Sequence, residues 1–367
     1  MSMGNQNFNE LLGLAAENGA SDVHVKAGKR AIFRIEGRLE EVEMEAITED
    51  QSLDFLDAVL PDSFKTRWEE EGQVDFGHSI GGIGRFRVAA FRQRGTVSVV
   101  FRYVKNEIPT FASLNLEAPV LTKICKSRDG IVIVSGATGS GKSSTLAAML
   151  NWMNGHVQRH VITLEDPMEY NFSDDHCVFN QREIGIDALS YSLGLKSALR
   201  QDPDAILIGE MRDKNTFETA LAAAETGHLV MTTLHSINVQ QAVIRLFEFF
   251  PPDQQEQMRR QVASSIRAIV CQRLVPAMEG GGRMPAVEIL VGDSVSRNVI
   301  QEGQFNKLNS IMDAAGESGS RSFNKDLFRL IKAGKISKAD GLAHSPNPKA
   351  LEMNLKGIFQ SEGGIIG

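Results

Sequence analysis

Apolar positions in the first hundred residues follow two different periods. Phe8, Leu11, Leu12 and Ala15 have the spacing that gives a helix one apolar face. Short runs rich in Val, Ile and Phe follow, separated by glycines, as in strands joined by turns. We predict strands at 23–26 and 31–35, a helix at about 49–60, and further strands between 76 and 104. Residues 1–104 are therefore predicted to form a small α+β domain.

From about residue 111 the pattern changes to apolar runs that alternate with helical segments, which is typical of a parallel α/β sheet. The predicted strands are 131–134, 160–164, 177–180, 205–208 and 229–233. The predicted helices lie near 115–126, 142–153, 189–200, 214–226 and 238–247. Beyond 250 the pattern is mostly helical, interrupted by CQRLVPAM and RMPAVEILV, which we predict to be a two-stranded piece. The polar stretch 105–110 is the predicted linker between this region, 111–367, and the first domain.

Composition narrows the class of protein. A hydrophobic content of 42% supports real cores, and a formal charge of -7 argues against a protein that mainly binds nucleic acid, because phosphate binding needs a basic surface. The three cysteines, Cys125, Cys177 and Cys271, show no pairing or zinc motif, which favours a reducing compartment. The chain has no secretory signal pattern and no apolar run near the roughly 20 residues of a membrane span. We expect a soluble cytoplasmic protein without direct membrane insertion.

The strongest chemical signal directly follows the strand at 131–134. GATGSGKS has the pattern G-x-x-x-x-G-K-S, with Gly136, Gly141, Lys142 and Ser143 at the fixed positions, and a helix follows. Such a loop cradles phosphates with its backbone N–H groups and the helix N-terminus, while the lysine reaches the β- and γ-phosphates and the serine binds Mg²⁺. The predicted nucleotide-binding residues are Gly136, Ala137, Thr138, Gly139, Ser140, Gly141, Lys142, Ser143 and Ser144, with Ser143 as the magnesium ligand.

Carboxylates follow two of the predicted strands. Glu210 comes after the strand at 205–208, and Gly209 stands where an ATPase strand usually carries Asp. We expect Glu210 to orient or deprotonate the attacking water; the alternative is a strand-end carboxylate paired with Arg212. Glu165 and Glu169 follow the strand at 160–164, where open α/β sheets bind ligands, although they also fit a polar turn. Asp213 is expected to cap the helix that begins near residue 214.

Histidines and arginines supply further candidates. His228 and His235 stand at the two ends of one apolar strand, and we expect contacts with nucleotide or with the Glu210 strand, or a structural role. A zinc site is not expected, because no third and fourth ligand lies at metal spacing. The first domain has arginines on adjacent strands: Arg85, Arg87, Arg92, Arg94 and Arg102. They fit either an exposed basic face or arginine fingers that reach a phosphate in a neighbouring subunit.

Together, GATGSGKSS, LEDPMEY, LRQDPDAILIGEMRD and AAAETGHLVMTTLHS resemble the Walker A, Asp box, Walker B and His box of secretion-superfamily motor ATPases. The nearest group is that of the type IV pilus retraction ATPases, PilT and PilU. The resemblance implies a PAS-like N-terminal domain and a RecA-like ATPase domain with C-terminal helices. It also implies catalytic roles for Glu210, Glu165 and Glu169, for the His-box residues His228 and His235, and for Arg87 and Arg102 of the N-terminal domain.

The function implied by the resemblance is ATP hydrolysis with Mg²⁺ by a homo-hexamer that retracts type IV pili. Its expected partners are the inner-membrane platform protein and a paralogous retraction ATPase, which would place it at the cytoplasmic side of the inner-membrane pilus machine. An accessory, PilU-like motor stays open, because SVSRNVIQEG (294–303) departs from the PilT pattern. An ATPase of a related type II/IV secretion or conjugation system stays open too. A nucleic-acid translocase is disfavoured by the acidic charge, and a small-molecule kinase by the lack of an acceptor site.

Overall fold

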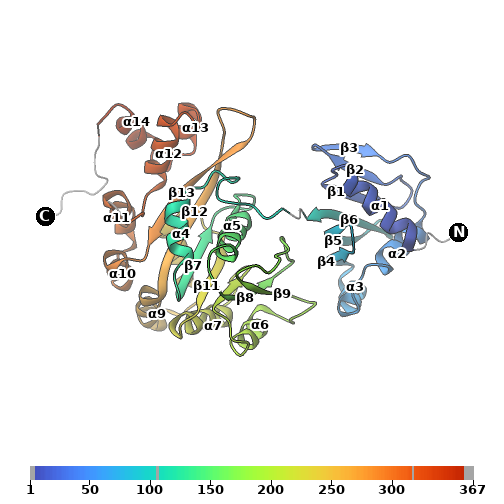
Figure 1. Ribbon diagram of the computed structural model, residues 1–367, viewed down its shortest axis with the longest axis horizontal. Coiled ribbons are helices and arrows are strands. Elements are labelled where there is room, and N and C mark those ends of the chain that lie inside the picture. Colours follow the sequence, from blue (N-terminus) through green and yellow to red (C-terminus); the bar gives the residue numbers. More distant parts are fainter. Residues whose placement is uncertain (1–4, 105–106, 316–317, 359–367) are drawn as a thin grey trace. The chain divides into compact units, whose positions relative to one another are not determined.

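The computed structural model describes residues 5–104, 107–315 and 318–358. Residues 105 and 106 of the predicted linker lie outside this range. The chain divides into two compact units (Figure 1). The first contains the chain up to Ile108 together with Glu165–Asn171 and Gln181–Ser190, and the second contains the rest.

The first unit is built on a six-stranded antiparallel sheet in the order β3-β2-β1-β6-β5-β4. The strands are β1 Asp22–Lys26, β2 Ile32–Ile35, β3 Arg38–Glu41, β4 Gln73–Ile80, β5 Gly84–Gln93 and β6 Thr96–Val104. The helices are α1 Asn5–Glu17, α2 Glu49–Asp57 and α3 Lys65–Glu71, with a 3-10 turn at Asp62–Phe64. β3 was not predicted, because all four of its residues are exposed and give no apolar alternation.

Alternation along β5 and β6 separates the core of the first unit from a charged face. Phe86, Val88 and Phe101 are buried and pack with Phe8 of α1 and with residues of α2. The residues between them point to the other face of the sheet. Arg87 on β5 and Arg102 on β6 are direct partners in the antiparallel register, so the two arginines lie side by side.

A buried glutamate from the middle of the sequence is tied into the first unit. Glu183 is only 1% exposed. Its Oε1 accepts the Gly77 N–H at 2.7 Å, and its Oε2 accepts the Met168 N–H at 3.1 Å and pairs with Arg85. Gly77 is required here, because a Cβ would lie 2.6 Å from Glu183 Oε2. The carboxylate therefore binds both inserted segments, 165–171 and 181–190, to β4 and β5.

The second unit has a seven-stranded sheet in the order β13-β12-β7-β11-β10-β8-β9. Its strands are β7 Gly130–Ser135, β8 His160–Glu165, β9 Val178–Glu183, β10 Ala205–Ile208, β11 Leu229–Leu234, β12 Ile266–Pro276 and β13 Arg283–Val291. Helices α4 to α9 are Ala118–Cys125, Lys142–Asn154, Tyr191–Ala198, Lys214–Glu225, Val239–Glu248 and Pro252–Ser265. The C-terminal helices α10 to α14 are Ser294–Gln301, Leu308–Ala314, Phe323–Lys332, Lys338–Ala343 and Pro348–Leu355, with a 3-10 turn at Phe305–Lys307.

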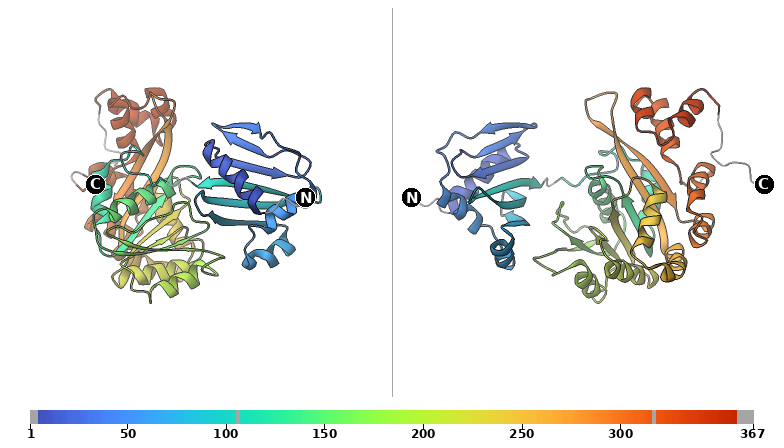
Figure 2. Two further views of the ribbon diagram at one scale, coloured as in Figure 1. Left: turned by 45° about the vertical axis from the view of Figure 1, so that its right-hand side comes forward. Right: turned by 180° about the vertical axis from the view of Figure 1, so that it is seen from behind.

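Helices cover both faces of this sheet. Every residue of β7, β10 and β11 is buried, which explains their almost unbroken apolar sequences. Figure 1 shows α4 and α5 on the near face, and the view from behind in Figure 2 shows α8 on the far face. The parallel pairings of β7, β8, β10, β11 and β12 bring the carboxyl ends of these strands to one edge. That edge is where a ligand of an open α/β sheet binds.

The predicted two-stranded piece is present, and it forms part of the seven-stranded sheet. β12 and β13 form an antiparallel pair, and β12 also pairs in parallel with β7. The reason is burial: Ala268, Ile269, Val270 and Cys271 are all 0% exposed, so the strand needs cover on both faces. The pairing brings β12 beside the strand that leads into the glycine-rich loop.

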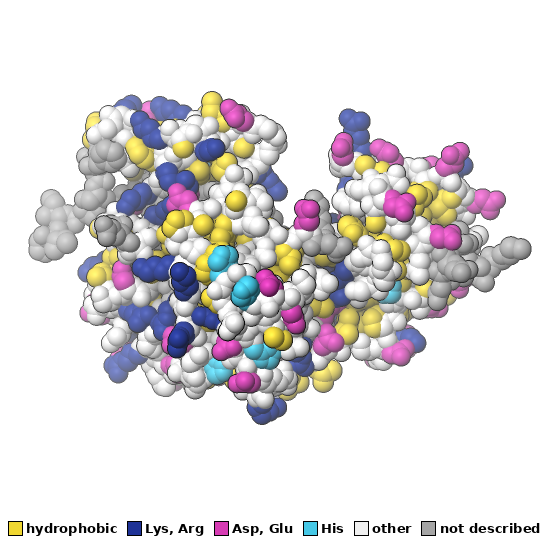
Figure 3. Space-filling view, viewed as in Figure 1, with side chains coloured by type: hydrophobic (Ala, Val, Ile, Leu, Met, Phe, Trp, Pro, Cys, Tyr) yellow, Lys and Arg dark blue, Asp and Glu magenta, His cyan; other side chains and the backbone are white. Residues whose placement is uncertain are grey.

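Charge is unevenly distributed over the surface. Figure 3 shows Lys and Arg side chains gathered on the second unit around α4, α9 and α10, whereas Asp and Glu side chains are scattered over the first. Exposed members of the basic group include Lys123, Lys126, Arg128 and Arg260. The basic surface is therefore local in a chain of net negative charge. Within the described residues, no helix is both long and apolar enough to cross a bilayer.

A buried carboxylate on β13, the strand paired with β12, predicts that the stability of the protein depends on pH. Glu288 on β13 is 2% exposed, and its Oε2 accepts the Val239 N–H at the start of α8 at 2.6 Å. Burial raises the pKa of Glu288 to about 7 from the ordinary 4.5. Because this pKa is raised in the folded state, Glu288 contributes to the free energy of unfolding most fully below pH 4.5. This contribution, up to about 3 kcal/mol, is lost as the pH rises through 7.

Glu288→Gln removes this titration. The melting temperature of the variant relative to wild type should therefore rise by several degrees between pH 5 and pH 8. Thermal unfolding followed by circular dichroism across this range measures it. Glu256→Gln, at an exposed position on α9, is the control and should show a constant difference. If the difference in melting temperature between Glu288→Gln and wild type were also constant from pH 5 to pH 8, the prediction would be contradicted.

Candidate active site

The glycine-rich loop joins β7 to α5 and has the backbone that its sequence requires. Gly139 and Gly141 have φ values of 76° and 91°, which favour glycine. At Gly136 a Cβ would lie 2.5 Å from the carbonyl oxygen of Gln272 on β12. The turn is therefore shaped by φ at two glycines and by the close approach of a neighbouring strand at the third.

Lys142, the first residue of α5, places a positive charge inside the loop. Its side chain is largely buried, and Nζ donates to Gly136 O at 3.0 Å and to Ala137 O at 3.1 Å. The hydroxyl of Ser140 is buried without a hydrogen-bond partner among the described residues. An ammonium, the N-terminus of a 13-residue helix and a buried hydroxyl together fit an anionic group such as phosphate. Ser143, in the first turn of α5, is half-buried at the same end.

Glu210 is held at the same edge of the sheet as the loop. The backbone before it is fixed on both sides, because Gly209 N–H donates to Leu164 O at 2.8 Å and Gly209 O accepts from Thr233 Oγ1 at 2.6 Å. The Glu210 carboxylate accepts from Arg212 Nε at 2.8 Å, so the ion pair with Arg212 that the sequence allowed is present. Asp213 caps α7 through the Thr216 N–H at 2.9 Å, which confirms the expected cap.

The two histidines that flank β11 lie at opposite edges of the sheet. His235 Nε2 lies 3.5 Å from Glu210 Oε1. Burial, and then the charge of Lys142, lower the pKa of His235 below 6.5, so the ring is neutral at pH 7. His228 precedes β11 at the opposite edge, where Nδ1 contacts Ala223 O at 2.9 Å. His235 thus joins Glu210 and Lys142, whereas His228 holds the end of α7.

The remaining predicted residues belong to the first unit. Glu165 is 9% exposed and accepts from Gln181 Nε2 at 3.3 Å, whereas Glu169 is exposed. Arg87 is exposed, and Arg102 donates from Nε to Asp22 Oδ1 at 2.8 Å. Although burial raises the pKa of Asp22, hydrogen bonds led by that of Arg102 outweigh it, so the net shift is downward. The carboxylate of Asp22 therefore stays charged and orients Arg102; the roles of Glu165, Glu169, Arg87 and Arg102 in a reaction stay predictions.

One polar residue at the loop, Gln272, was not predicted. Gln272 on β12 is 5% exposed and makes side-chain hydrogen bonds to Ser140 and Thr145. It lies within a segment that was predicted only as a strand. The available signal was a single amide within VCQRLV, because a buried amide needs partners.

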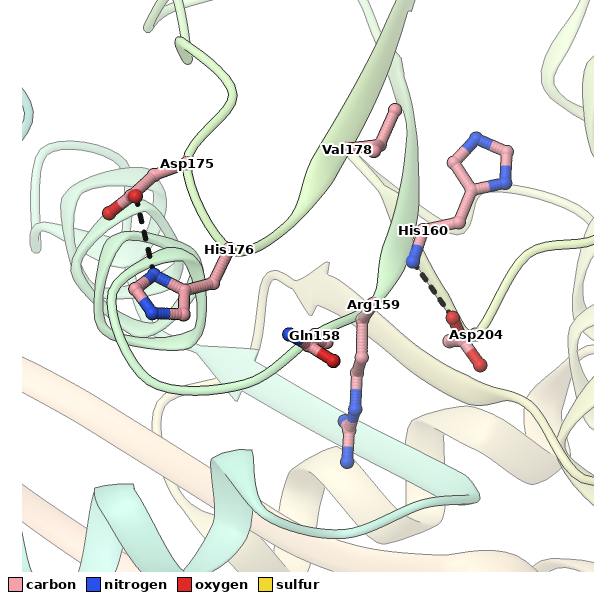
Figure 4. Close-up of a pocket in the computed structure, with 7 residues that line it drawn as sticks. All are labelled: Gln158, Arg159, His160, Asp175, His176, Val178 and Asp204. Atoms are coloured by element: carbon pink, nitrogen blue, oxygen red, sulfur yellow. Dashed lines mark hydrogen bonds and ion pairs between the residues drawn. The ribbon is translucent and has the colours of Figure 1, made fainter.

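A hollow at the other edge of the sheet does not fit a ligand site (Figure 4). It has a volume of about 470 Å³ and is lined by Gln158, Arg159, His160, Asp175, His176, Val178 and Asp204. Two of its polar side chains already bind protein: His160 Nε2 contacts Asn180 at 2.7 Å, and Arg159 Nη2 donates to Lys126 O at 3.1 Å. The carboxyl edge, with the loop and Glu210, is therefore the candidate active site.

Comparisons with known proteins show the family to which the chain belongs. A family model described as Type II/IV secretion system protein matches residues 5–280. The chain is 37% identical over 349 residues to the type IV pilus ATPase PilU of Pseudomonas aeruginosa, covering 95% of this chain and 91% of PilU. It is 36% identical over 340 residues to the type IV pilus retraction ATPase PilT of the same organism, covering 93% of this chain and 98% of PilT.

A solved structure resembles both units. The crystal structure of the pilus retraction motor PilT with bound ADP matches with a TM-score of 0.85 and 41% identity, covering 94% of this chain and 98% of that one. The likeness confirms the predicted α/β fold class, with a PAS-like first domain and a RecA-like second domain.

Proposed function

Because the chain belongs to the type II/IV secretion system protein family, we propose that it is an ATP-hydrolysing motor that retracts type IV pili. The observation that carries the proposal is the near full-length likeness to PilU and PilT in a chain whose loop, Lys142, Glu210 and His235 meet at one sheet edge. An accessory role like that of PilU is the second candidate, supported by the 37% identity to PilU.

The proposed binding step uses the loop and α5. The loop N–H groups and the helix N-terminus receive the phosphates of ATP. Lys142 exchanges its bonds to Gly136 O and Ala137 O for oxygens of the β- and γ-phosphates. The Ser143 hydroxyl is the proposed protein ligand of Mg²⁺, which supplies neutralisation of phosphate charge when bound.

In the proposed hydrolysis step, Glu210 orients the attacking water and accepts its proton. The water oxygen forms a bond to the γ-phosphorus as the bond to the β–γ bridging oxygen breaks, leaving ADP and phosphate. Arg212 and His235 hold the carboxylate from two sides. The strand lacks an Asp at position 209, so Gly209 serves as a backbone anchor, fixed to Leu164 and Thr233.

We propose that the working form is a homo-hexamer whose site is completed by Arg87 and Arg102 of the neighbouring subunit. The two arginines lie side by side in register, and Asp22 orients one of them. A guanidinium placed on the γ-phosphate stabilises the charge of the transition state. The acids Glu165 and Glu169 are proposed to take part from the end of β8.

Mixing two inactive variants tests whether the arginines act between subunits. Arg87→Ala and Glu210→Gln proteins are each expected to lose ATP turnover, roughly 10³-fold in the first case. Mixed oligomers should regain activity, because some sites combine an intact Glu210 with an intact Arg87 from the neighbour. Steady-state phosphate release against mixing ratio measures it. Arg38→Ala, at an exposed position on β3, should turn over normally; mixtures without recovery would place Arg87 in its own subunit's site or outside the chemistry.

Deletion of the gene in its own host tests the pilus function. A retraction motor, when lost, leaves surface pili in place but abolishes their shortening, as seen by fluorescence microscopy of labelled pili. The wild-type gene should restore shortening, and the gene carrying Glu210→Gln should not. Loss of surface pili would instead indicate an assembly ATPase, and normal pilus dynamics would indicate another secretion system. Residual shortening with reduced force would identify the accessory role.

A further inference from the structure

Gln272 on β12 lies beside the phosphate-binding loop, and its side chain bonds the end of the loop and the helix that follows. In the parallel pairing of β12 with β7, Cys271 lies opposite Ser135, the last residue of β7. Gln272 is the next residue, so it lies beside the point where the loop begins. Its side chain is almost completely buried, and the amide therefore has no water to replace lost partners.

Both halves of the Gln272 amide are used. Nε2 donates to Ser140 O at 2.8 Å, and Oε1 accepts from Thr145 Oγ1 at 2.7 Å. Ser140 lies in the loop, and Thr145 lies one turn into α5, where its N–H donates to Gly141 O at 2.9 Å. The amide thus joins the end of the loop to the first turn of the helix through the neighbouring strand.

The loop glycines are fitted to the same residue. A Cβ on Gly141 would lie 2.7 Å from Gln272 Nε2, and one on Gly136 would lie 2.5 Å from Gln272 O. Real Cβ contacts are essentially never this short, so Gln272 adds to the need for glycine that the φ values of 154° at Gly136 and 91° at Gly141 already create.

We infer that Gln272 is a positioning residue that sets the direction of the Gly141 N–H for phosphate binding. A trans peptide is planar, with its C=O and N–H pointing to opposite sides. A Ser140 carbonyl held toward β12 therefore turns the Gly141 N–H away from β12, where it is available to an anion. This inference rests on the proposed function, because it assumes that the loop binds a nucleotide.

Affinity for a fluorescent ADP analogue, mant-ADP, tests the inference without relying on turnover. Gln272→Met keeps the length of the side chain but removes both bonds, and it should weaken mant-ADP binding and raise the KM for ATP by roughly tenfold, while kcat falls less. Thr145→Val should produce part of the same loss. The double variant should be no weaker than Gln272→Met, because the two residues act through one contact.

Asn154→Leu is the matched control. Asn154 is 7% exposed, lies at the other end of α5, and donates from Nδ2 to Ser173 O at 2.8 Å. It should lower the melting temperature as Gln272→Met does, yet leave mant-ADP affinity within about twofold. Equal weakening by both variants would show a general loss of structure and overturn the inference, as would unchanged affinity in Gln272→Met.

Gln272→Glu covers the case in which the Met variant does not fold. It keeps the acceptor for Thr145 and removes only the donor to Ser140, so affinity should fall at least as far as in Gln272→Met at pH 7; wild-type affinity in this variant would overturn the inference. Wild-type protein that binds no mant-ADP would overturn the proposed function itself. If the wild type binds mant-ADP and the variants bind it with the same affinity, only the role of Gln272 is overturned.

Discussion

Glu210→Gln is expected to lower ATP turnover by about 10²- to 10⁴-fold while ATP still binds. The substitution keeps the size of the side chain and one oxygen, but it removes the group that accepts the proton of the water. Since Arg212 lies 2.8 Å and His235 3.5 Å from the carboxylate, the amide is held in nearly the same place. The loss should therefore fall on kcat, measured by phosphate release at saturating ATP, and affinity for mant-ATP should change little.

Glu218→Gln is the control for this experiment. Glu218 lies on α7, is exposed, and pairs only with Lys214 at 3.6 Å among the described residues. Its removal should leave kcat within about twofold, since exposed ion pairs contribute little. A Glu210→Gln protein with near-normal kcat would remove the proposed role of Glu210 and return it to a carboxylate that pairs with Arg212.

Lys142→Ala is expected to abolish nucleotide binding at micromolar concentrations. The ammonium is largely buried inside the loop, so it would meet phosphate in a site with little screening by water. Removing one member of such a charge pair costs about 2–5 kcal/mol, which is roughly 30-fold or more in Kd. Titration with mant-ADP measures the loss, and ADP should no longer raise the melting temperature.

Two comparisons show that the loss comes from the loop. Lys123→Ala, at an exposed position on α4, should bind mant-ADP as wild type does. Thermal unfolding of Lys142→Ala without ligand measures separately how much stability is lost with the bonds to Gly136 O and Ala137 O. Retained affinity in Lys142→Ala would mean that the loop does not hold the phosphates.

The features that could be predicted well from the sequence depend on residues that are close together in the chain. The loop from Gly136 to Ser143, the strand before Glu210 and the cap at Asp213 each depend on local spacing, and the structure has all three. Buried strands such as β7 and β11 were equally clear, because an unbroken apolar run has few other uses.

The missed features depend on pairing between distant segments. Glu183 contacts Gly77 across 106 residues, and Gln272 contacts Ser140 across 132. No local period specifies such partners, and the same is true of β12 beside β7. A polar residue inside an apolar strand was the available sign at Gln272. Glu183 follows the polar residues Asn180, Gln181 and Arg182, so it did not stand out in the sequence. The approach of His235 to Glu210 also required the strand order, because it depends on β11 lying beside β10.

The path of the chain has a mechanical consequence. It passes from one unit to the other after residues 108, 164, 171, 180 and 190. The two units are thus joined by five covalent crossings, so no single flexible connection carries all the force between them. Because Glu183 fastens the inserted segments to the first unit, any pull on that unit is transmitted through peptide bonds to the end of β8. In a motor, such parallel tethers would share the load and would deliver it to the strand that leads to Glu165.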